Sequence, residues 1–228
     1  MKRFTTQGII LARTDYGEAD RIMTFITPDN GKVKAIAKGV RKSKSKLAGG
    51  IELFSISDLS LIIGKSEINT LISTRLVKHY GNIVKDLERT NLAYELIMLM
   101  NKATEDNPEA SYFNLLMQAL ESLNDAAINL ELVRVWFYAQ LLKLAGQSPN
   151  LRSQKSGEKL QASQKYDFNF DTMSFQLGDT YNSDQIKYLR LLFSNNSPIT
   201  LQKVQDSEKL ARQTKSLVSS MLQNFVRL

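Results

Sequence analysis

The period of the hydrophobic residues changes from 2 to 3.6 near residue 80, and this change limits the possible folds more than any other feature. Before it, strand-like patterns cover residues 7–13, 20–27, a basic segment after residue 31, 54–63 and 67–77. Short strands at this density, with a long connection between the third and fourth, are typical of a five-stranded OB-fold barrel. An SH3-like barrel is the structural alternative.

After residue 80, apolar residues at helical spacing predict a mainly α-helical region. The expected helices contain residues 83–98, 112–123, 133–144, 183–193 and 207–227, with a break at Asn107 and Pro108 between the first two. The polar segment 152–165 predicts an exposed loop, and 166–178 a short β-hairpin. The expected class is therefore α+β, with an OB-fold nucleic-acid-binding domain at 1–80 and a helical domain at 81–228.

Residues 31–50 contain seven Lys and Arg residues and no Asp or Glu. The first of them alternate with apolar residues, as in a half-buried strand, and the rest alternate with serine, as in an exposed loop. Such a run can simply keep a loop soluble. However, residues 1–80 hold 14 basic and 7 acidic residues, whereas residues 81–228 hold 16 of each, so the whole net charge of +7 lies in the first part. This asymmetry favours a charged binding surface for a polyanion such as a nucleic-acid backbone.

Several classes of site are not expected from the composition. The chain has no cysteine and one histidine, His79, so disulfides and a Cys/His zinc site are excluded, and His79 is interpreted as a structural residue. Neither a catalytic set nor a phosphate-binding glycine loop is found, so we expect no enzyme and no cofactor. No apolar run approaches the roughly 18 residues of a membrane span, which favours a cytoplasmic protein.

The N-terminal part resembles a known family. DYGEADRI, followed by TPDNGKVKAIAKGVRKSKSKLAGG and then ELFS, closely resembles the N-terminal domain of the RecO family of bacterial recombination mediators. Further on, LLKLAGQSPNL at 141–151 is similar to the helix end that precedes a four-cysteine zinc site in many RecO proteins. Here Ser153 and Ser156 stand where the first two cysteines would be. Serine does not replace a thiolate ligand of structural zinc, so the hairpin must be held by packing.

The resemblance implies a function in recombinational repair. It implies binding of single- and double-stranded DNA without sequence specificity, annealing of complementary strands, and loading of RecA onto DNA coated by single-stranded DNA-binding protein. The implied partners are RecR and the acidic C-terminal tail of single-stranded DNA-binding protein; a role for RecF is left open. No nucleotide hydrolysis is implied, and the expected location is the cytoplasm, at the nucleoid.

Basic residues of the N-terminal part are the candidate phosphate contacts. They are Lys32, Lys34, Lys38, Arg41, Lys42, Lys44 and Lys46, with Lys2, Arg3 and Arg21 as additions. Arg21 could instead pair with Asp15 or Glu18 in its own turn. Stacking on bases has few candidates, Tyr16, Phe25 and Phe54, of which two are expected to be buried, so backbone charge should dominate.

The helical region supplies a second candidate site. In the RecO family the acidic tail of single-stranded DNA-binding protein docks on the helical domain, and the helix around Arg134 resembles that region. Arg134 and Trp136 are the candidate partner-binding residues, because aromatic and arginine side chains commonly anchor interfaces.

Two other functions fit parts of the sequence. One is a metal-dependent nuclease that uses Asp15, Glu18 and Asp20 as ligands, although a second carboxylate cluster is lacking. The other is an OB-fold protein associated with RNA or the ribosome.

Overall fold

The computed structural model describes residues 2–64, 68–104 and 110–225. The chain forms two compact units, Met1–Asp125 and Ala126–Leu228, so the strand-to-helix change near residue 80 lies within the first unit. Three details of the expected elements lie outside the described residues. They are the start of the fifth strand with the turn before it (65–67), the break at Asn107 and Pro108, and the end of the last helix (226–227).

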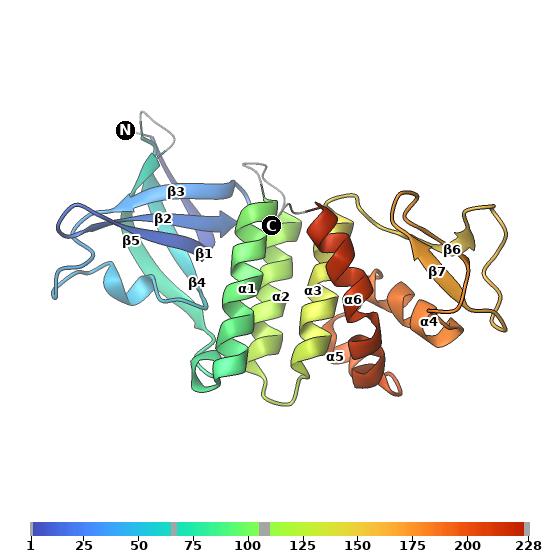
Figure 1. The fold of residues 1–228 in the computed structure, drawn as a ribbon. Helices are drawn as coiled ribbons and strands as arrows, with labels where there is room; N and C mark the ends of the chain where they lie inside the picture. Colours follow the sequence, from blue (N-terminus) through green and yellow to red (C-terminus); the bar gives the residue numbers. More distant parts are fainter. Residues whose placement is uncertain (1, 65–67, 105–109, 226–228) are drawn as a thin grey trace. The chain divides into compact units, whose positions relative to one another are not determined.

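Five strands close into a barrel in the first unit (Figure 1). They are β1 (Arg3–Tyr16), β2 (Asp20–Thr27), β3 (Gly31–Ala37), β4 (Ser55–Ile62) and β5 (Ile68–His79). The order is β1-β2-β3-β5-β4, and the long strand β1 pairs with both β2 and β4. All pairs are antiparallel except β3 with β5. This closed arrangement confirms the predicted OB-fold barrel.

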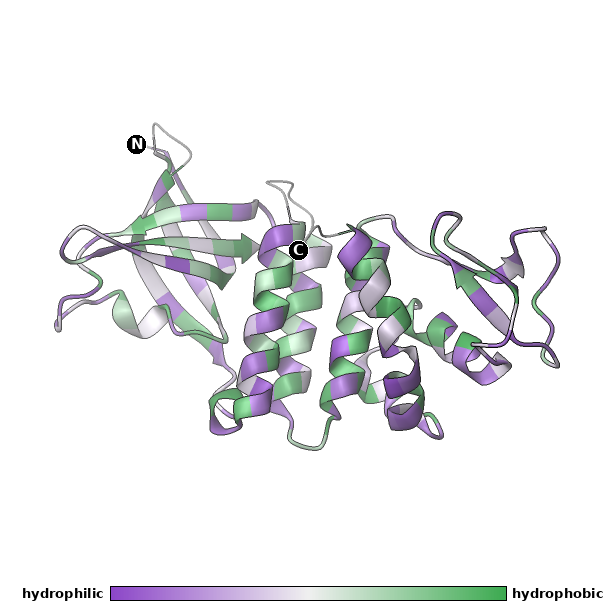
Figure 2. Cartoon of the chain, viewed as in Figure 1, coloured by the Kyte–Doolittle hydropathy of each residue, from purple (hydrophilic) through white to green (hydrophobic). Residues whose placement is uncertain are grey.

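Alternation along the strands separates the core of the barrel from its surface. Val33, Ala35 and Ala37 of β3 are buried in the core with Phe25 of β2, while Lys34 is exposed. Figure 2 shows hydrophobic and hydrophilic residues following one another along these strands. Because successive strand residues point to opposite faces, the same pattern that builds the core also presents lysines to solvent.

Two helices, α1 (Leu87–Ala103) and α2 (Ala110–Asn124), pack against the barrel strands β1 and β2. α1 begins after Asp86, whose carboxylate accepts the backbone N–H groups of Glu88 and Arg89. Not all apolar residues at helical spacing in the predicted helix 83–98 are buried: Leu87, Tyr94 and Met98 are exposed. The buried face is instead formed by Leu92, Ala93, Leu96, Ile97, Leu99 and Met100, because the residues before Asp86 form a separate 3-10 turn, η2 (Ile83–Lys85).

The second unit combines helices with a small sheet. Its helices are α3 (Leu130–Leu144), α4 (Ser183–Leu192), the short α5 (Pro198–Leu201) and α6 (Ser207–Phe225), and α3 packs against the other three. Strands β6 (Asn150–Gln154), β7 (Tyr166–Asn169) and β8 (Ser174–Leu177) form a sheet in the order β6-β8-β7. The predicted hairpin is confirmed as β7 and β8. The predicted loop 152–165 was wrong at its start, because residues 152–154 belong to β6, which runs parallel to β8.

In the described part of the chain, no helix combines the length and the apolar character needed to span a membrane.

Candidate nucleic-acid interface

The lysines of β3 and the following loop differ in their surroundings. Lys34 and Lys38 are exposed, as are Lys42, Lys44 and Lys46 in the segment 38–50, which we call the basic loop. Lys32 is only half-exposed, and its Nζ donates a hydrogen bond to the carbonyl oxygen of Asn101 at 2.6 Å. Lys32 therefore joins β3 to the C-terminal end of α1, while the other lysines extend into solvent.

The start of the basic loop is bound to the turn between β1 and β2. Gly39 has a φ of +63°, which favours glycine, and its N–H donates to Asp20 Oδ1 at 2.7 Å. The N–H of Arg41 donates to the carbonyl oxygen of Ala19 at 2.9 Å. The DYGEAD segment is thus the support on which the basic loop begins.

The end of the loop is bound to β5. Thr74 Oγ1 donates to the carbonyl oxygen of Leu47 at 3.1 Å, just before the 3-10 turn η1 (Ala48–Gly50). Gly50 lies so close to this threonine that an added Cβ would be 2.1 Å from Thr74 Oγ1, so a larger residue could not fit without displacing it. With both ends held by the barrel, the loop loses less conformational entropy on binding a ligand than a free loop would.

Asp15 reduces the free charge of two predicted phosphate contacts. Its carboxylate pairs with Arg21 at 2.7 Å and lies 3.6 Å from Arg41. The hydrogen bond from Arg21 is the main reason why the pKa of Asp15 lies below its usual value. The alternative pairing of Arg21 within its own turn is therefore the one observed.

The nuclease alternative requires a carboxylate cluster in this same turn. Asp15 faces arginines, and Asp20 accepts the N–H of Gly39. Within the described residues, no group of three or more His, Cys, Asp or Glu side chains could hold a metal ion. Asp15, Glu18 and Asp20 therefore do not form the proposed ligand set.

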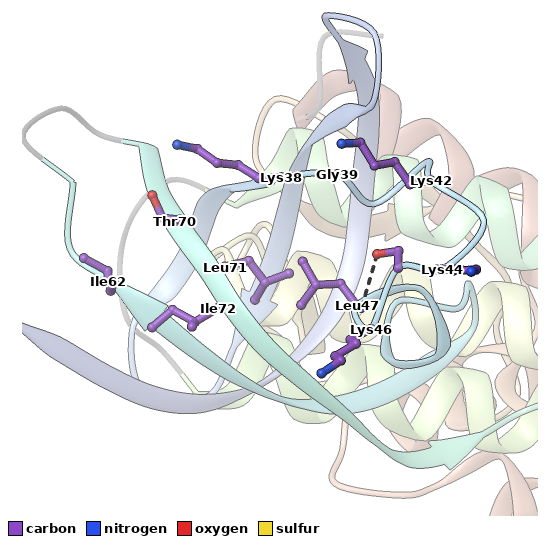
Figure 3. Close-up of a pocket in the computed structure, with 11 residues that line it drawn as sticks. Lys38, Gly39, Lys42, Lys44, Lys46, Leu47, Ile62, Thr70, Leu71 and Ile72 are labelled. Atoms are coloured by element: carbon purple, nitrogen blue, oxygen red, sulfur yellow. Dashed lines mark hydrogen bonds between the residues drawn. The ribbon is translucent and has the colours of Figure 1, made fainter.

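A cavity of about 480 Å³ lies between the basic loop and β5 (Figure 3). Four lysines line it, Lys38, Lys42, Lys44 and Lys46, and we call them the lysine rim. The other lining residues are Gly39, Ser45, Leu47, Ile62, Thr70, Leu71 and Ile72. None of the described lining residues is acidic, and no salt bridge between described residues involves the rim. The site therefore combines uncompensated positive charge with an apolar surface.

The remaining N-terminal candidates lie on the barrel. Lys2 and Arg3 are exposed, and Arg3 pairs across β1 and β4 with Ile62, one of the cavity residues. Among the aromatic candidates, Tyr16 is 56% exposed, whereas Phe25 and Phe54 are buried. Of these three rings only Tyr16 is accessible, so this surface offers a ligand mainly charge.

The predicted partner site on α3 needs a correction. Trp136 is 2% exposed, and its indole N–H donates to the carbonyl oxygen of Asn196 at 2.7 Å, so it belongs to the core and does not line a groove. Its ring is covered because α3 packs against three other helices. Arg134 pairs with Glu131, which also forms a salt bridge with Lys215 at 2.7 Å. Burial acts to raise the pKa of Glu131, but these cations outweigh it, and the pKa lies below its usual value.

Sequence reasoning missed the residues that shape the site. Asp20 was considered only as a metal ligand, and Thr74, Leu71 and Ile72 were part of an ordinary strand. The glycine pair at 49–50 after the basic run was the available signal for a close approach of the loop to the barrel. The cavity itself depends on the parallel pairing of β3 with β5, which local patterns do not reveal.

Replacing Asp20 tests the support of the loop. We expect Asp20→Ala to lower the free energy of unfolding by about 1–2 kcal/mol, because the N–H of Gly39 loses a charged acceptor. Glu18→Ala is the matched control, since Glu18 is exposed in the same turn and removes the same charge. Urea unfolding of both variants measures the difference, and equal stability of the two would contradict this role for Asp20.

Comparison with known proteins identifies one family over nearly the whole chain. The family models "Recombination protein O N terminal" and "Recombination protein O C terminal" match residues 1–80 and 84–226. Curated proteins named DNA repair protein RecO are similar to this chain. That of Dehalococcoides mccartyi strain 195 is 34% identical over 86% of this chain and 80% of its own length. Those of D. mccartyi strain CBDB1 and Desulfatibacillum aliphaticivorans are 36% and 34% identical, over 72% and 66% of this chain. The matches cover 64% and 60% of those two relatives, less than two thirds of their length. With both family models matched and the OB-fold barrel carrying its basic loop, the chain belongs to the RecO family.

Proposed function

We propose that this protein is a DNA-binding recombination mediator that acts in recombinational repair. It binds single- and double-stranded DNA without reading sequence, anneals complementary strands, and helps to load RecA onto DNA coated by single-stranded DNA-binding protein. It does so as a binding protein, without catalysing a reaction, in the cytoplasm at the nucleoid. The proposal rests on membership of the RecO family and on the charge of the barrel surface.

The observation that carries the proposal is the group of exposed lysines with no acidic partner among the described residues. Lys34 on β3 is followed by the lysine rim on an anchored loop. Lysine side chains contact phosphates as flexible point charges and do not distinguish bases. Binding should therefore depend strongly on salt and little on sequence.

Annealing follows from the same electrostatics. Two complementary strands repel each other until their phosphates are neutralised, and a basic surface that contacts both strands lowers this repulsion. A protein that only read base edges would not assist pairing, because it would compete for the atoms that the two strands need.

The partners belong to the proposal as well. We propose RecR and the acidic C-terminal tail of single-stranded DNA-binding protein, both on the family resemblance, and RecF as a further candidate. The burial of Trp136 does not support it as a tail contact, and the pairing of Arg134 with Glu131 leaves its positive charge partly compensated.

An annealing assay tests the proposal. Complementary labelled oligonucleotides are coated with single-stranded DNA-binding protein and mixed with and without the wild-type chain. We expect the chain to raise the annealing rate about tenfold at low salt, because it screens the repulsion between strands. No acceleration at any salt concentration would refute the proposed activity.

The two alternatives give different results in the same experiment. RNA oligonucleotides of the same sequence distinguish the RNA-associated alternative, which predicts equal or tighter binding to RNA without annealing. Incubation of the DNA with Mg²⁺ or with a chelator distinguishes the nuclease alternative, which predicts cleavage only with the metal.

A further inference from the structure

We propose that the cavity beneath the lysine rim receives one unpaired nucleobase while the rim binds the phosphates on either side of it. This inference deepens the proposed function and rests on it. It assigns the cavity to single-stranded nucleic acid, whereas the surface lysines alone would serve single and double strands alike.

The arrangement of the side chains suits a base between two phosphates. Figure 3 shows Leu47 and Leu71 pointing toward each other, while Ile72 extends from the opposite face of β5; Lys38 and Lys42 lie on one side of these residues and Lys46 on the other. Leu71 is buried, while Ile72 is 40% exposed and forms an open part of the cavity surface. A flat apolar face can therefore rest on the exposed Ile72 while the charged backbone remains at the rim.

Two hydroxyl groups can form hydrogen bonds with the polar edge of a base without distinguishing one kind of base from another. Thr70 and Ser45 both line the cavity, and the Ser45 hydroxyl already accepts the N–H of Leu47 at 3.3 Å. A hydroxyl both donates and accepts, so it can bond to either kind of edge atom. The cavity volume of about 480 Å³ lies within the usual range for small-molecule sites, about 300–1,000 Å³.

A double helix cannot place a base in the cavity without an additional free-energy cost. Its bases are stacked and paired, and moving one out of the stack costs a few kcal/mol. The rim lysines contact its phosphates in either case. The cavity should therefore add affinity for single strands only, even though the surface has few accessible aromatic residues.

An acidic peptide with an apolar side chain would satisfy the same charges but is less well supported. Extended peptides commonly bind by adding a strand to an open sheet edge. Here β3 pairs with β5 and closes the barrel, so around the cavity only the part of β5 after Thr70, which pairs with β4 alone, could accept an added strand among the described residues. In contrast, Lys34 on β3 continues the rim beyond the cavity, as a nucleic-acid backbone requires.

The test compares oligonucleotides with and without bases. The full chain is titrated with a single strand of about 15 nucleotides and with an abasic strand of equal length and charge. We expect the wild type to bind the strand with bases about fivefold to tenfold more tightly, because only that strand can bury a base. Ile72→Ser should remove most of this difference while leaving duplex binding and the salt dependence unchanged.

Leu76→Ser is the matched control, since Leu76 is on the same strand, is 41% exposed and does not line the cavity. It should keep the preference for bases, and thermal unfolding should show both variants folded. Equal wild-type affinity for the two strands, with strong salt dependence, would overturn the base site and leave the proposed function intact. No salt-dependent binding of any DNA would instead refute the proposed function. Binding of an Asp- and Phe-containing peptide that depends on Ile72, with no effect of Ile72 on DNA, would assign the cavity to peptides and overturn the inference.

Discussion

Replacing the lysine rim by alanine at Lys38, Lys42, Lys44 and Lys46 is expected to produce the largest loss of DNA binding. Each lysine that neutralises a phosphate of a single strand contributes about 0.7 to the slope of log K against log salt, so four contribute about 3. At about 0.1 M salt this corresponds to a loss of affinity of at least about a hundredfold, and the wild type and variant should converge near 1 M. Fluorescence anisotropy across a salt series measures both quantities.

A control variant with the same net charge distinguishes the effect of the lysine rim from the effect of the overall net charge. Lys155, Lys159, Lys203 and Lys209 are exposed in the second unit, and their replacement by alanine also lowers the net charge by four, from +7 to +3. We expect this variant to retain affinity within about threefold, because none of these lysines belongs to the lysine rim or to the barrel. A similar loss in both variants would show that net charge, and not the lysine rim, governs binding. Annealing should fail only in the rim variant.

The barrel surface could be predicted because its signals are local. The alternation of lysines with Val33 and Ala35 fixes which face of β3 is buried, whatever the rest of the chain does. The run from Arg41 to Lys46 contains nothing to bury, so its exposure follows directly. The function of Asp20 was not predictable in the same way, since its partner, the N–H of Gly39, is brought to it only when β2 and β3 pair.

The failed predictions share a different cause. A tryptophan beside an arginine on a helix fits an interface anchor and a core residue equally well, and the packing of α4, α5 and α6 against α3 decided for the core. Likewise, Leu87 and Tyr94 continue a helical pattern in sequence, but the cap at Asp86 sets where the helix begins, and the buried face lies elsewhere. β6 was missed because its partner, β8, lies about twenty residues away in a parallel pairing that has no local period.

Phe175→Ala is expected to destabilise the second unit strongly. Phe175 is fully buried on β8, the central strand of the small sheet, and lies opposite Phe168. The centroid of its ring lies 5.1 Å from the ring centroid of Phe168, 5.9 Å from that of Tyr181 and 6.4 Å from that of Tyr166. The chain has no cysteine, so neither a disulfide nor a thiolate-bound zinc ion can hold this sheet. Truncation of such a residue leaves a cavity and costs about 3–5 kcal/mol.

Urea unfolding followed by fluorescence measures this cost, because the single tryptophan, Trp136, is buried in the same unit. Phe170→Ala is the control: its ring also contacts Phe168, at 5.1 Å, but it is 40% exposed and its loss should cost about 1 kcal/mol or less. A chelator should leave the wild-type unfolding curve unchanged, since the chain has no cysteine and no described group of three or more His, Asp or Glu could hold a metal. If Phe175→Ala cost no more than Phe170→Ala, or if the chelator destabilised the wild type, the aromatic cluster would not be what stabilises the sheet.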